Sequence, residues 1–204
     1  MKFFFYLACQ VVTAPVWISF LLLALVLDRN TLVASYTQFL SLFPGKTGSF
    51  IRLANYRFLL QHSDYNAFVG FGTLFSQHAT RLERGIYIGP QCNIGSCHIG
   101  QDSILGSGVH LLSGKAQHGS IESGVKFRDV KGHYEQIAIG RNCWIGNGAI
   151  VMASVGDNCV IGAGSVVTQN IPAYSLAAGN PARVIKKIES SSDSADHKPA
   201  ETLQ

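Results

Sequence analysis

The chain has 204 residues, of which 47% are hydrophobic and 14% charged, and its formal net charge is +4. This length suits one domain with an appendage. Neither a long basic tract nor a basic patch interleaved with aromatic residues occurs, which excludes a typical nucleic-acid-binding protein. The five cysteines include no CxxC pair. We therefore expect reduced, partly buried thiols in a cytosolic compartment rather than a disulfide framework.

A nearly uninterrupted apolar segment runs from Phe3 to Leu27. It is long enough to cross the hydrocarbon core of a bilayer, which is about 30 Å thick. Pro15 should kink a helix in its middle. A cleaved secretory signal is one alternative, but only Lys2 precedes the apolar residues and no clean cleavage site precedes Asp28. A buried core helix is the other, and we expect attachment to a membrane.

Basic residues dominate the stretch that follows this segment, namely Arg29, Lys46, Arg52 and Arg57. Because Lys and Arg accumulate on the cytoplasmic side, we expect the bulk of the chain on the cytoplasmic face of the inner membrane. The segment could either span the bilayer or dip in and return. Residues 50–58 place apolar side chains at helical spacing, which indicates an amphipathic helix against the membrane or against the next domain. Residues 1–60 thus form a predicted helical, membrane-associated region.

The pattern then changes to a period of six. Residues 65–85 repeat only faintly and predict an irregular first coil, whereas residues 88–111 and 139–167 carry an aliphatic residue about every six positions, usually followed by glycine. This period is typical of neither a plain strand nor a helix, and it fits short strands joined by tight turns in a parallel β-helix. Short units at 94–98 and 151–154 predict tightened corners. The residues expected to point inward are Ile88, Ile94, Ile99, Leu105, Ile139, Ile145, Val151, Val155 and Ile161.

A polar loop at residues 112–136 separates the two blocks and carries both charge signs. Long loops in a compact scaffold are usually functional or disordered. His118 lies near its start and is the candidate catalytic residue, although a histidine at such a position can also be merely solvated. After Pro172 the sheet pattern ends. We expect a short basic helix at residues 182–188, which closes a domain of residues 61–188, and a disordered tail at residues 189–204.

Several motifs together resemble those of one enzyme family. They are the two hexapeptide blocks, the SGKAQH segment before the loop, Trp144 in CWIG, IGAGSVVTQNIP and AAGNPARVIKK. Over roughly residues 86–188 the chain resembles the left-handed β-helix acyltransferases. It is most similar to the maltose/galactoside/xenobiotic O-acetyltransferase group, in particular to membrane-associated members of polysaccharide biosynthesis. The resemblance implies an all-β, left-handed parallel β-helix, a homotrimer, acetyl-CoA as donor, no required metal, and a sugar hydroxyl of a glycan or lipid-linked polysaccharide precursor as acceptor.

The resemblance also implies roles for individual residues. His118 would be a general base that takes the proton of the attacking hydroxyl, while backbone N–H groups stabilise the oxyanion. Glu122 or Asp129 could orient it. Residues matching contacts to coenzyme A are Asn147, Ala163, Thr168, Gln169, Arg183 and Lys186. Gln169 departs from the usual lysine, which puts one phosphate contact in doubt. Residues matching the acceptor site are Asn93, Trp144 and Glu122.

Three other functions remain open at this point. The enzyme could acylate an amino sugar on nitrogen instead of oxygen. The same scaffold also serves γ-type carbonic anhydrases, which need three histidines around zinc. Two of these form a His-x4-His pair, and no such pair exists among His78, His98, His110, His118 and His133. Finally, the chain could be an inactive trimeric scaffold at the membrane, which an intact His118 and coenzyme-binding end argue against.

Overall fold

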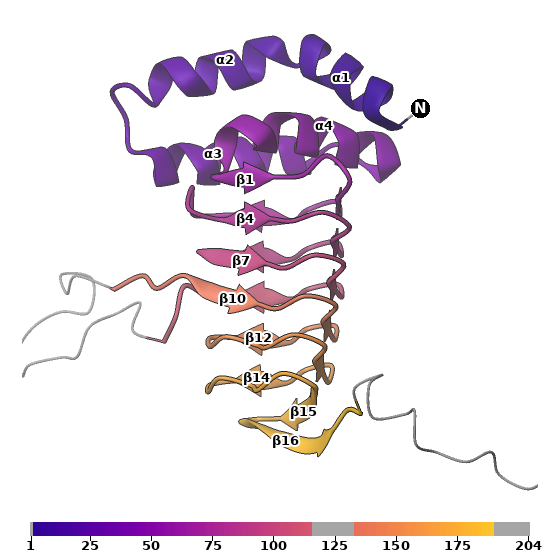
Figure 1. The fold of residues 1–204 in the computed structure, drawn as a ribbon. Helices are drawn as coiled ribbons and strands as arrows, with labels where there is room; N and C mark the ends of the chain where they lie inside the picture. Colours follow the sequence, from indigo (N-terminus) through magenta and orange to yellow (C-terminus); the bar gives the residue numbers. More distant parts are fainter. Residues whose placement is uncertain (1, 116–132, 190–204) are drawn as a thin grey trace, which may run out of the picture.

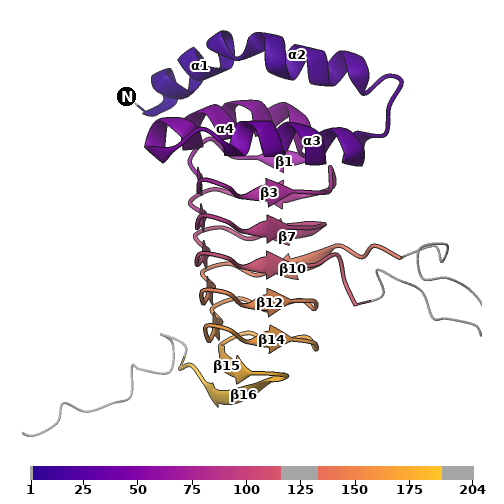
Figure 2. The same ribbon diagram turned by 180° about the vertical axis from the view of Figure 1, so that it is seen from behind.

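The computed structural model describes residues 2–115 and 133–189. A cap of helices lies across one end of a column of stacked β coils (Figure 1). The helices are α1 (Lys2–Val12), α2 (Ala14–Leu23), α3 (Arg29–Ser41) and α4 (Gly45–Leu59). Seen from behind, α1 and α2 form the outer layer of the cap, and α3 and α4 lie between them and the first coil (Figure 2).

The column consists of about five coils. Each of the first four coils gives one short strand to each of three parallel sheets, and the next coil joins the first of these sheets only through an isolated bridge at Val155. The strands are β1 (His62–Ser63), β2 (Phe68–Val69), β3 (Leu74–Phe75), β4 (Arg81–Leu82), β5 (Tyr87–Ile88), β6 (Asn93–Ile94), β7 (Cys97–Ile99), β8 (Ile104–Leu105), β9 (His110–Leu111), β10 (Ile137–Ile139), β11 (Trp144–Ile145), β12 (Ile150–Val151), β13 (Val160–Ile161), β14 (Val166–Val167), β15 (Ser175–Gly179) and β16 (Ala182–Lys187). Sheet A has the order β1-β4-β7-β10, sheet B the order β16-β15-β13-β11-β8-β5-β2, and sheet C the order β14-β12-β9-β6-β3.

The core of the column is a set of aliphatic ladders. In sheet B, Val69, Ile88, Leu105, Ile145 and Ile161 pair in register from coil to coil and are all buried. Every inward-pointing residue predicted from the six-residue period is buried, so the predicted β-helix is confirmed. In the two-residue strands the second residue points inward and the first outward, as the alternation of side chains along a strand requires.

The first coil is regular, and the prediction of an irregular one is wrong. Strands β1, β2 and β3 pair in parallel with β4, β5 and β6. The six-residue spacing persists there, because Ser63, Val69 and Phe75 occupy the inward positions and are buried. The aliphatic-glycine signature is missing because a serine and a phenylalanine replace the usual isoleucine. The sequence therefore shows the repeat only faintly, although the backbone follows it.

The corners between sheets differ in how much extra chain they can hold. At the corner from sheet B to sheet C the coils nearly touch, and a Cβ at Gly146 would lie 2.4 Å from the backbone nitrogen of Ala163. The corner from sheet C to sheet A varies in length. It is short between Ile94 and Ile99 and between Val151 and Val155, as predicted, whereas the third coil inserts the long loop there.

The C-terminal segment forms a strand, and the prediction of a helix at residues 182–188 is wrong. Strand β16 (Ala182–Lys187) pairs antiparallel with β15 and closes the end of sheet B. The turn between them uses Gly179 with φ +105°, a conformation that suits glycine. The β-branched Val184 and Ile185 favour an extended chain, and Val184 pairs with Ala177 of β15, while Ile185 lies at an irregularity in the register. Residues 190–204, where a disordered tail was expected, lie outside the described residues.

The apolar N-terminal segment forms two short helices rather than one long one. α1 and α2 meet at a bend of 60° next to Pro15, so the predicted kink is confirmed. Among the described helices none is by itself long and apolar enough to cross a membrane. The α1–α2 pair meets that criterion only when taken together across its bend, and only on length and composition.

A buried arginine joins the cap to the column. The side chain of Arg52, on α4, is fully buried. It donates from Nη2 and Nε to the carbonyl of Val69 at 2.8 and 3.1 Å, and from Nη1 to the carbonyl of Phe43 at 2.6 Å. Burial lowers the pKa of Arg52, but a guanidinium stays charged at neutral pH because its ordinary value is so high. One cation therefore satisfies carbonyls from both the end of α3 and the first coil, and a cation suits the C-terminal end of a helix.

Replacing Arg52 by methionine should destabilise the protein by about 3 kcal/mol, because buried carbonyls lose their donors. Urea unfolding followed by circular dichroism would measure this change. The matched control is Arg57→Met on the same helix, where the side chain is exposed, and we expect a change below about 0.5 kcal/mol. Equal stability of the two variants would show that Arg52 does not secure the cap.

Candidate functional site

The loop that carries the predicted base leaves the column at the corner from sheet C to sheet A. Its two ends lie together, because the backbone nitrogen of Glu135 donates to the carbonyl of Ser113 at 3.0 Å. The Ser113 hydroxyl in turn accepts from the backbone nitrogen of Ser96 at 2.8 Å, which fixes the exit point to the previous coil. His118, Glu122 and Asp129 lie outside the described residues, so their predicted roles stay predictions.

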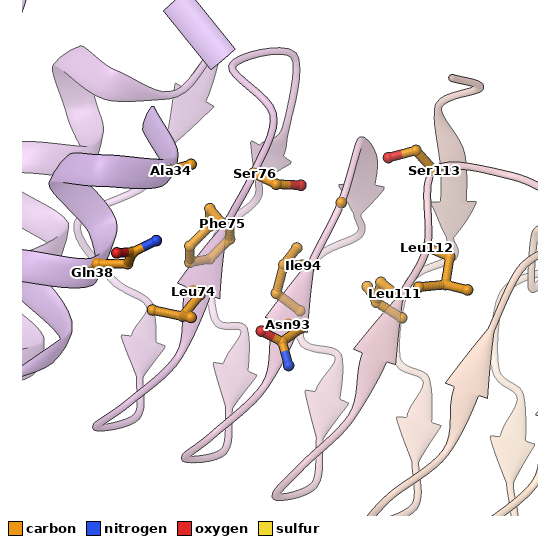
Figure 3. A pocket seen from close by; sticks show the side chains of 11 residues that line it. Ala34, Gln38, Leu74, Phe75, Ser76, Asn93, Ile94, Leu111, Leu112 and Ser113 are labelled. Atoms are coloured by element: carbon orange, nitrogen blue, oxygen red, sulfur yellow. The ribbon is translucent and has the colours of Figure 1, made fainter. Parts of the chain in front are cut away.

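A pocket of about 210 Å³ opens beside this exit (Figure 3). Its lining comes from α3, from strands β3, β6 and β9 of sheet C and from the exit itself, and comprises Ala34, Gln38, Leu74, Phe75, Ser76, Asn93, Ile94, Gly95, Leu111, Leu112 and Ser113. The predicted acceptor residue Asn93 is exposed, and its amide nitrogen lies 3.4 Å from Nδ1 of His110. The pocket thus offers an amide, a hydroxyl and an apolar wall at the point where the loop begins.

The predicted coenzyme residues fall into separate groups. Asn147 and Ala163 follow β11 and β13 at the corner from sheet B to sheet C, one coil apart. Asn147 connects three coils there. Its side-chain oxygen accepts from the backbone nitrogen of Ser107 at 3.1 Å, and its carbonyl accepts from the backbone nitrogen of Gly164 at 2.8 Å. Arg183 lies on the same edge. It pairs with Ala178, and Ala178 lies next to Gly162, the residue before Ala163.

The remaining coenzyme residues lie elsewhere on the column. Thr168 and Gln169 follow β14, at the corner from sheet C to sheet A. Lys186 pairs with Leu176 on the outer side of sheet B. Within one chain the structure therefore brings Asn147, Ala163 and Arg183 to one edge of the column and Thr168 and Gln169 to another. Sheet C separates the two edges.

The outer face of sheet B carries an apolar strip that the sequence reasoning recognised only at Trp144. The outward residues of successive strands align in register, and they are Phe68, Tyr87, Ile104, Trp144, Val160 and Leu176. Trp144 is 58% exposed, and the rings of Phe68 and Tyr87 stack with centroids 4.9 Å apart. The signal was available in the sequence, because these residues directly precede the inward aliphatic residues.

Sequence reasoning also missed the contribution of the cap to the pocket. Ala34 and Gln38 lie on consecutive turns of α3 and form one wall (Figure 3). α3 packs beside β3, and the hydroxyl of Thr37 donates to the carbonyl of Phe75 at 3.0 Å, which fixes this wall in place. No periodic signal marks these helix residues, because their contacts are with strands far along the chain.

The cysteines are free and buried, as expected of structural thiols. Burial raises the pKa of the Cys143 thiol to about 11, and it also raises the pKa of Cys92 and Cys159. The thiols of Cys143 and Cys159 donate to carbonyls at the coil corners. Such protonated, enclosed thiols are poor nucleophiles. Among residues 2–115 and 133–189, no group of three or more His, Cys, Asp or Glu side chains is placed to hold a metal ion.

Comparisons with known proteins agree with this geometry. Residues 136–169 match the family model described as the hexapeptide repeat of succinyl-transferase. No curated protein matches the chain. Among solved structures, a maltose O-acetyltransferase from Clostridium difficile 630 is 26% identical, with 80% of this chain and 90% of that chain covered and a TM-score of 0.59. Together, the repeat match and the likeness to this enzyme support an acyltransferase built on hexapeptide repeats.

The predicted resemblance to left-handed β-helix acyltransferases is thereby confirmed. A galactoside acetyltransferase in complex with coenzyme A has the same fold, with 24% identity, 88% of this chain and 92% of that chain covered, and a TM-score of 0.63. Both alignments extend well beyond the residues of the repeat match. They therefore include part of the helical cap as well as the column of this acyltransferase.

The buried thiols give a testable pH dependence. A raised pKa keeps a thiol protonated, so at pH 8 only about one Cys143 side chain in a thousand should be thiolate. We expect Ellman's reagent to react with the folded acyltransferase at least about 100-fold more slowly than with the protein in urea, with the rate rising about tenfold per pH unit between pH 7 and 9. A cysteine that reacts rapidly at pH 8 in the folded protein would contradict this and indicate a thiol nucleophile.

Proposed function

We propose that this acyltransferase moves the acetyl group of acetyl-CoA to a sugar hydroxyl of a glycan or of a lipid-linked polysaccharide precursor. The observation that carries the proposal is the position of the loop. The SGKAQH segment leaves the column at Ser113, on the rim of the pocket that contains Asn93. The relatives support the chemistry, because the two solved structures most useful for comparison are an O-acetyltransferase and an acetyltransferase with coenzyme A.

In the proposed reaction His118 is the general base. It takes the proton of the acceptor hydroxyl while the oxygen attacks the carbonyl carbon of the thioester. The carbon–sulfur bond then breaks, and His118 returns the proton to the departing sulfur. His118 lies five residues beyond Ser113, so an extended chain would carry it no farther than about 18 Å from that residue. This span covers the neighbouring pocket, where Asn93 would hold the acceptor by hydrogen bonds.

We further propose a homotrimer with the donor in clefts between subunits. The predicted coenzyme residues occupy two edges of one column, with Arg183 on one and Thr168 on the other. One molecule of coenzyme A could serve both edges if it lay across sheet C or if adjacent subunits each supplied one edge. The exposed apolar strip around Trp144 supports subunit contact, because soluble monomers rarely expose large contiguous apolar patches.

We also propose that the enzyme works at the cytoplasmic face of the inner membrane. The support is chemical and comes from the sequence. Acetyl-CoA would be drawn from the cytosol, and the exposed basic residues Arg29, Lys46 and Arg57 favour that side. A place in polysaccharide biosynthesis belongs to the same proposal, since lipid-linked glycan precursors are accessible at this surface.

The decisive experiment incubates purified enzyme with acetyl-labelled acetyl-CoA and a panel of glycans and lipid-linked glycans. Label released from the product by mild alkali indicates an ester and hence O-acetylation, whereas stable label indicates an amide on an amino sugar. In this assay His118→Ala should lower kcat by about 10²–10⁴-fold with little change in affinity for acetyl-CoA, because general bases contribute about that much. His133→Ala is the matched histidine control and should retain most of the activity.

The pH dependence of the rate is a second test of His118 as the general base. In the wild type, kcat/KM should rise with pH through one ionisation between about 6 and 7.5, because free imidazole is the active form. More than about a tenth of wild-type activity in His118→Ala would place the base elsewhere. Failure of every sugar acceptor, with intact hydrolysis of acetyl-CoA, would contradict the acceptor class but not the acyl chemistry.

Arg183 gives a separate test of the donor site. Its guanidinium is exposed at the end of the Asn147–Ala163 edge, where it could bind a phosphate of the coenzyme. Losing one charge-assisted hydrogen bond should raise KM for acetyl-CoA about 10-fold or more in Arg183→Ala and leave kcat nearly unchanged. The matched control is Lys187→Ala, because Lys187 already donates to the hydroxyl of Ser175 at 3.2 Å. An equal KM in both variants would remove Arg183 from the donor site.

A further inference from the structure

The outer face of the α1–α2 pair is a continuous apolar surface. The inner face packs against the rest of the cap, where Tyr6, Cys9 and Phe20 are buried and Trp17 stacks on Phe58 with ring centroids 4.2 Å apart. The outer face and the turn after α2 instead expose large side chains to solvent. The most exposed are Phe4, Val11, Val12, Leu22, Leu25 and Val26, each 62–79% exposed.

The charge around this surface is mainly positive. No acidic residue occurs between Lys2 and Leu27. Lys2 and Lys46 line the same small pocket at one end of the helix pair, and exposed Arg29 lies beyond the other end. Two carboxylates lie beside the helix pair. Asp28 accepts from the backbone nitrogen of Thr31 at 2.7 Å and caps α3, and Asp64 lines a pocket together with Leu7 of α1 and the cationic Arg57. An apolar face bordered by cations is complementary to anionic lipid headgroups above acyl chains.

We propose that this face lies flat in the lipid–water interface of an anionic membrane and does not cross it. α1 and α2 have 11 and 10 residues, so each is about 16 Å long, roughly half the thickness of a bilayer core. Their inner faces pack against α4, and α2 also packs against α3 (Figures 1 and 2). Insertion across the bilayer would strip these contacts or draw polar parts of the cap into the hydrocarbon. The flat arrangement preserves the packing and covers the exposed face.

The surface is independent of the acyl chemistry, since none of its residues lies in the pocket or on the coenzyme edges. A second copy of the chain could cover the same face. In the absence of lipid, a second copy as the occupant predicts an oligomer held together by this face, whereas lipid as the occupant predicts that the face stays uncovered. Lipid as the occupant predicts binding that requires anionic vesicles and weakens with salt, because part of the attraction is electrostatic.

The first experiment is co-sedimentation of full-length protein with vesicles of phosphatidylethanolamine and phosphatidylglycerol, and with vesicles of phosphatidylcholine alone. We expect stronger binding to the anionic vesicles. The triple variant Val12→Gln, Leu22→Gln, Leu25→Gln should bind at least about tenfold more weakly. Because these side chains make the outer face, the variant should keep the circular dichroism and thermal unfolding of the wild type. The control is Ile185→Gln at the opposite end of the column, where the side chain is about as exposed as that of Leu22, and its binding should be unchanged.

The second experiment measures depth, and it uses the fact that the native thiols are buried. Fluorophores on Phe4→Cys, Val12→Cys and Leu25→Cys should all be quenched more by a spin label near the lipid headgroup than by one deep in the acyl chain. In addition, a membrane-impermeant maleimide outside the vesicles should reach both Lys2→Cys and Lys46→Cys.

Each contrary result overturns the proposal in a recognisable way. A label at Val12 that is deeper than those at Phe4 and Leu25 indicates a re-entrant hairpin. Protection of Lys2→Cys together with labelling of Lys46→Cys indicates a spanning segment. Absence of vesicle binding, with an oligomer that the triple variant dissociates, identifies a second copy as the occupant. None of these outcomes depends on acetyl transfer, so the proposed flat attachment and the proposed acyl chemistry succeed or fail separately.

Discussion

In-register stacking of one coil on the next is the constraint on which the rest of the molecule depends. Each inward aliphatic side chain must meet its counterpart one strand spacing away, about 4.8 Å, and each corner must let two backbones approach. The corner at Gly146 shows how little space remains, since a Cβ there would meet the backbone of Ala163 at 2.4 Å. Variation is therefore confined to the corner from sheet C to sheet A. That corner carries the loop with His118, so the functional insertion lies where the stacking tolerates extra chain.

The same constraint explains how much of the fold could be predicted. The period of six identified the inward residues because an aliphatic ladder has a strict repeat. It missed the first coil because Ser63 and Phe75 keep the spacing but not the residue type. The final strand was mistaken for a helix because a short basic segment has no periodicity to read. Its structure is decided by pairing with β15, which is a tertiary contact that overrides local preference.

The candidate site was predictable in its parts but not in its arrangement. Family resemblance predicted roles for Asn147, Arg183 and Thr168, but it could not reveal that Asn147 and Arg183 lie on one edge of the column and Thr168 on another. The pocket was beyond sequence reasoning for a different reason. Its wall on α3 depends on Thr37 binding the carbonyl of Phe75 across the junction of cap and column. Such contacts between a helix and a strand far along the chain leave no pattern in the sequence.

The cap makes the column directional, and this links the membrane face to the proposed chemistry. Two helical layers of about 10 Å each and the first coils, about 4.8 Å apart, separate the outer face of α1–α2 from the loop exit by about 30 Å. A lipid-linked acceptor would have to extend that far from the bilayer, which favours a sugar remote from its lipid over the sugar attached to it.

Rotational symmetry about an axis parallel to the columns keeps all the caps at one end, where a single flat membrane can bind them together. A twofold axis perpendicular to the columns would place the caps at opposite ends, and one membrane could then bind only one of them. The proposed trimer and the proposed flat attachment are therefore geometrically compatible.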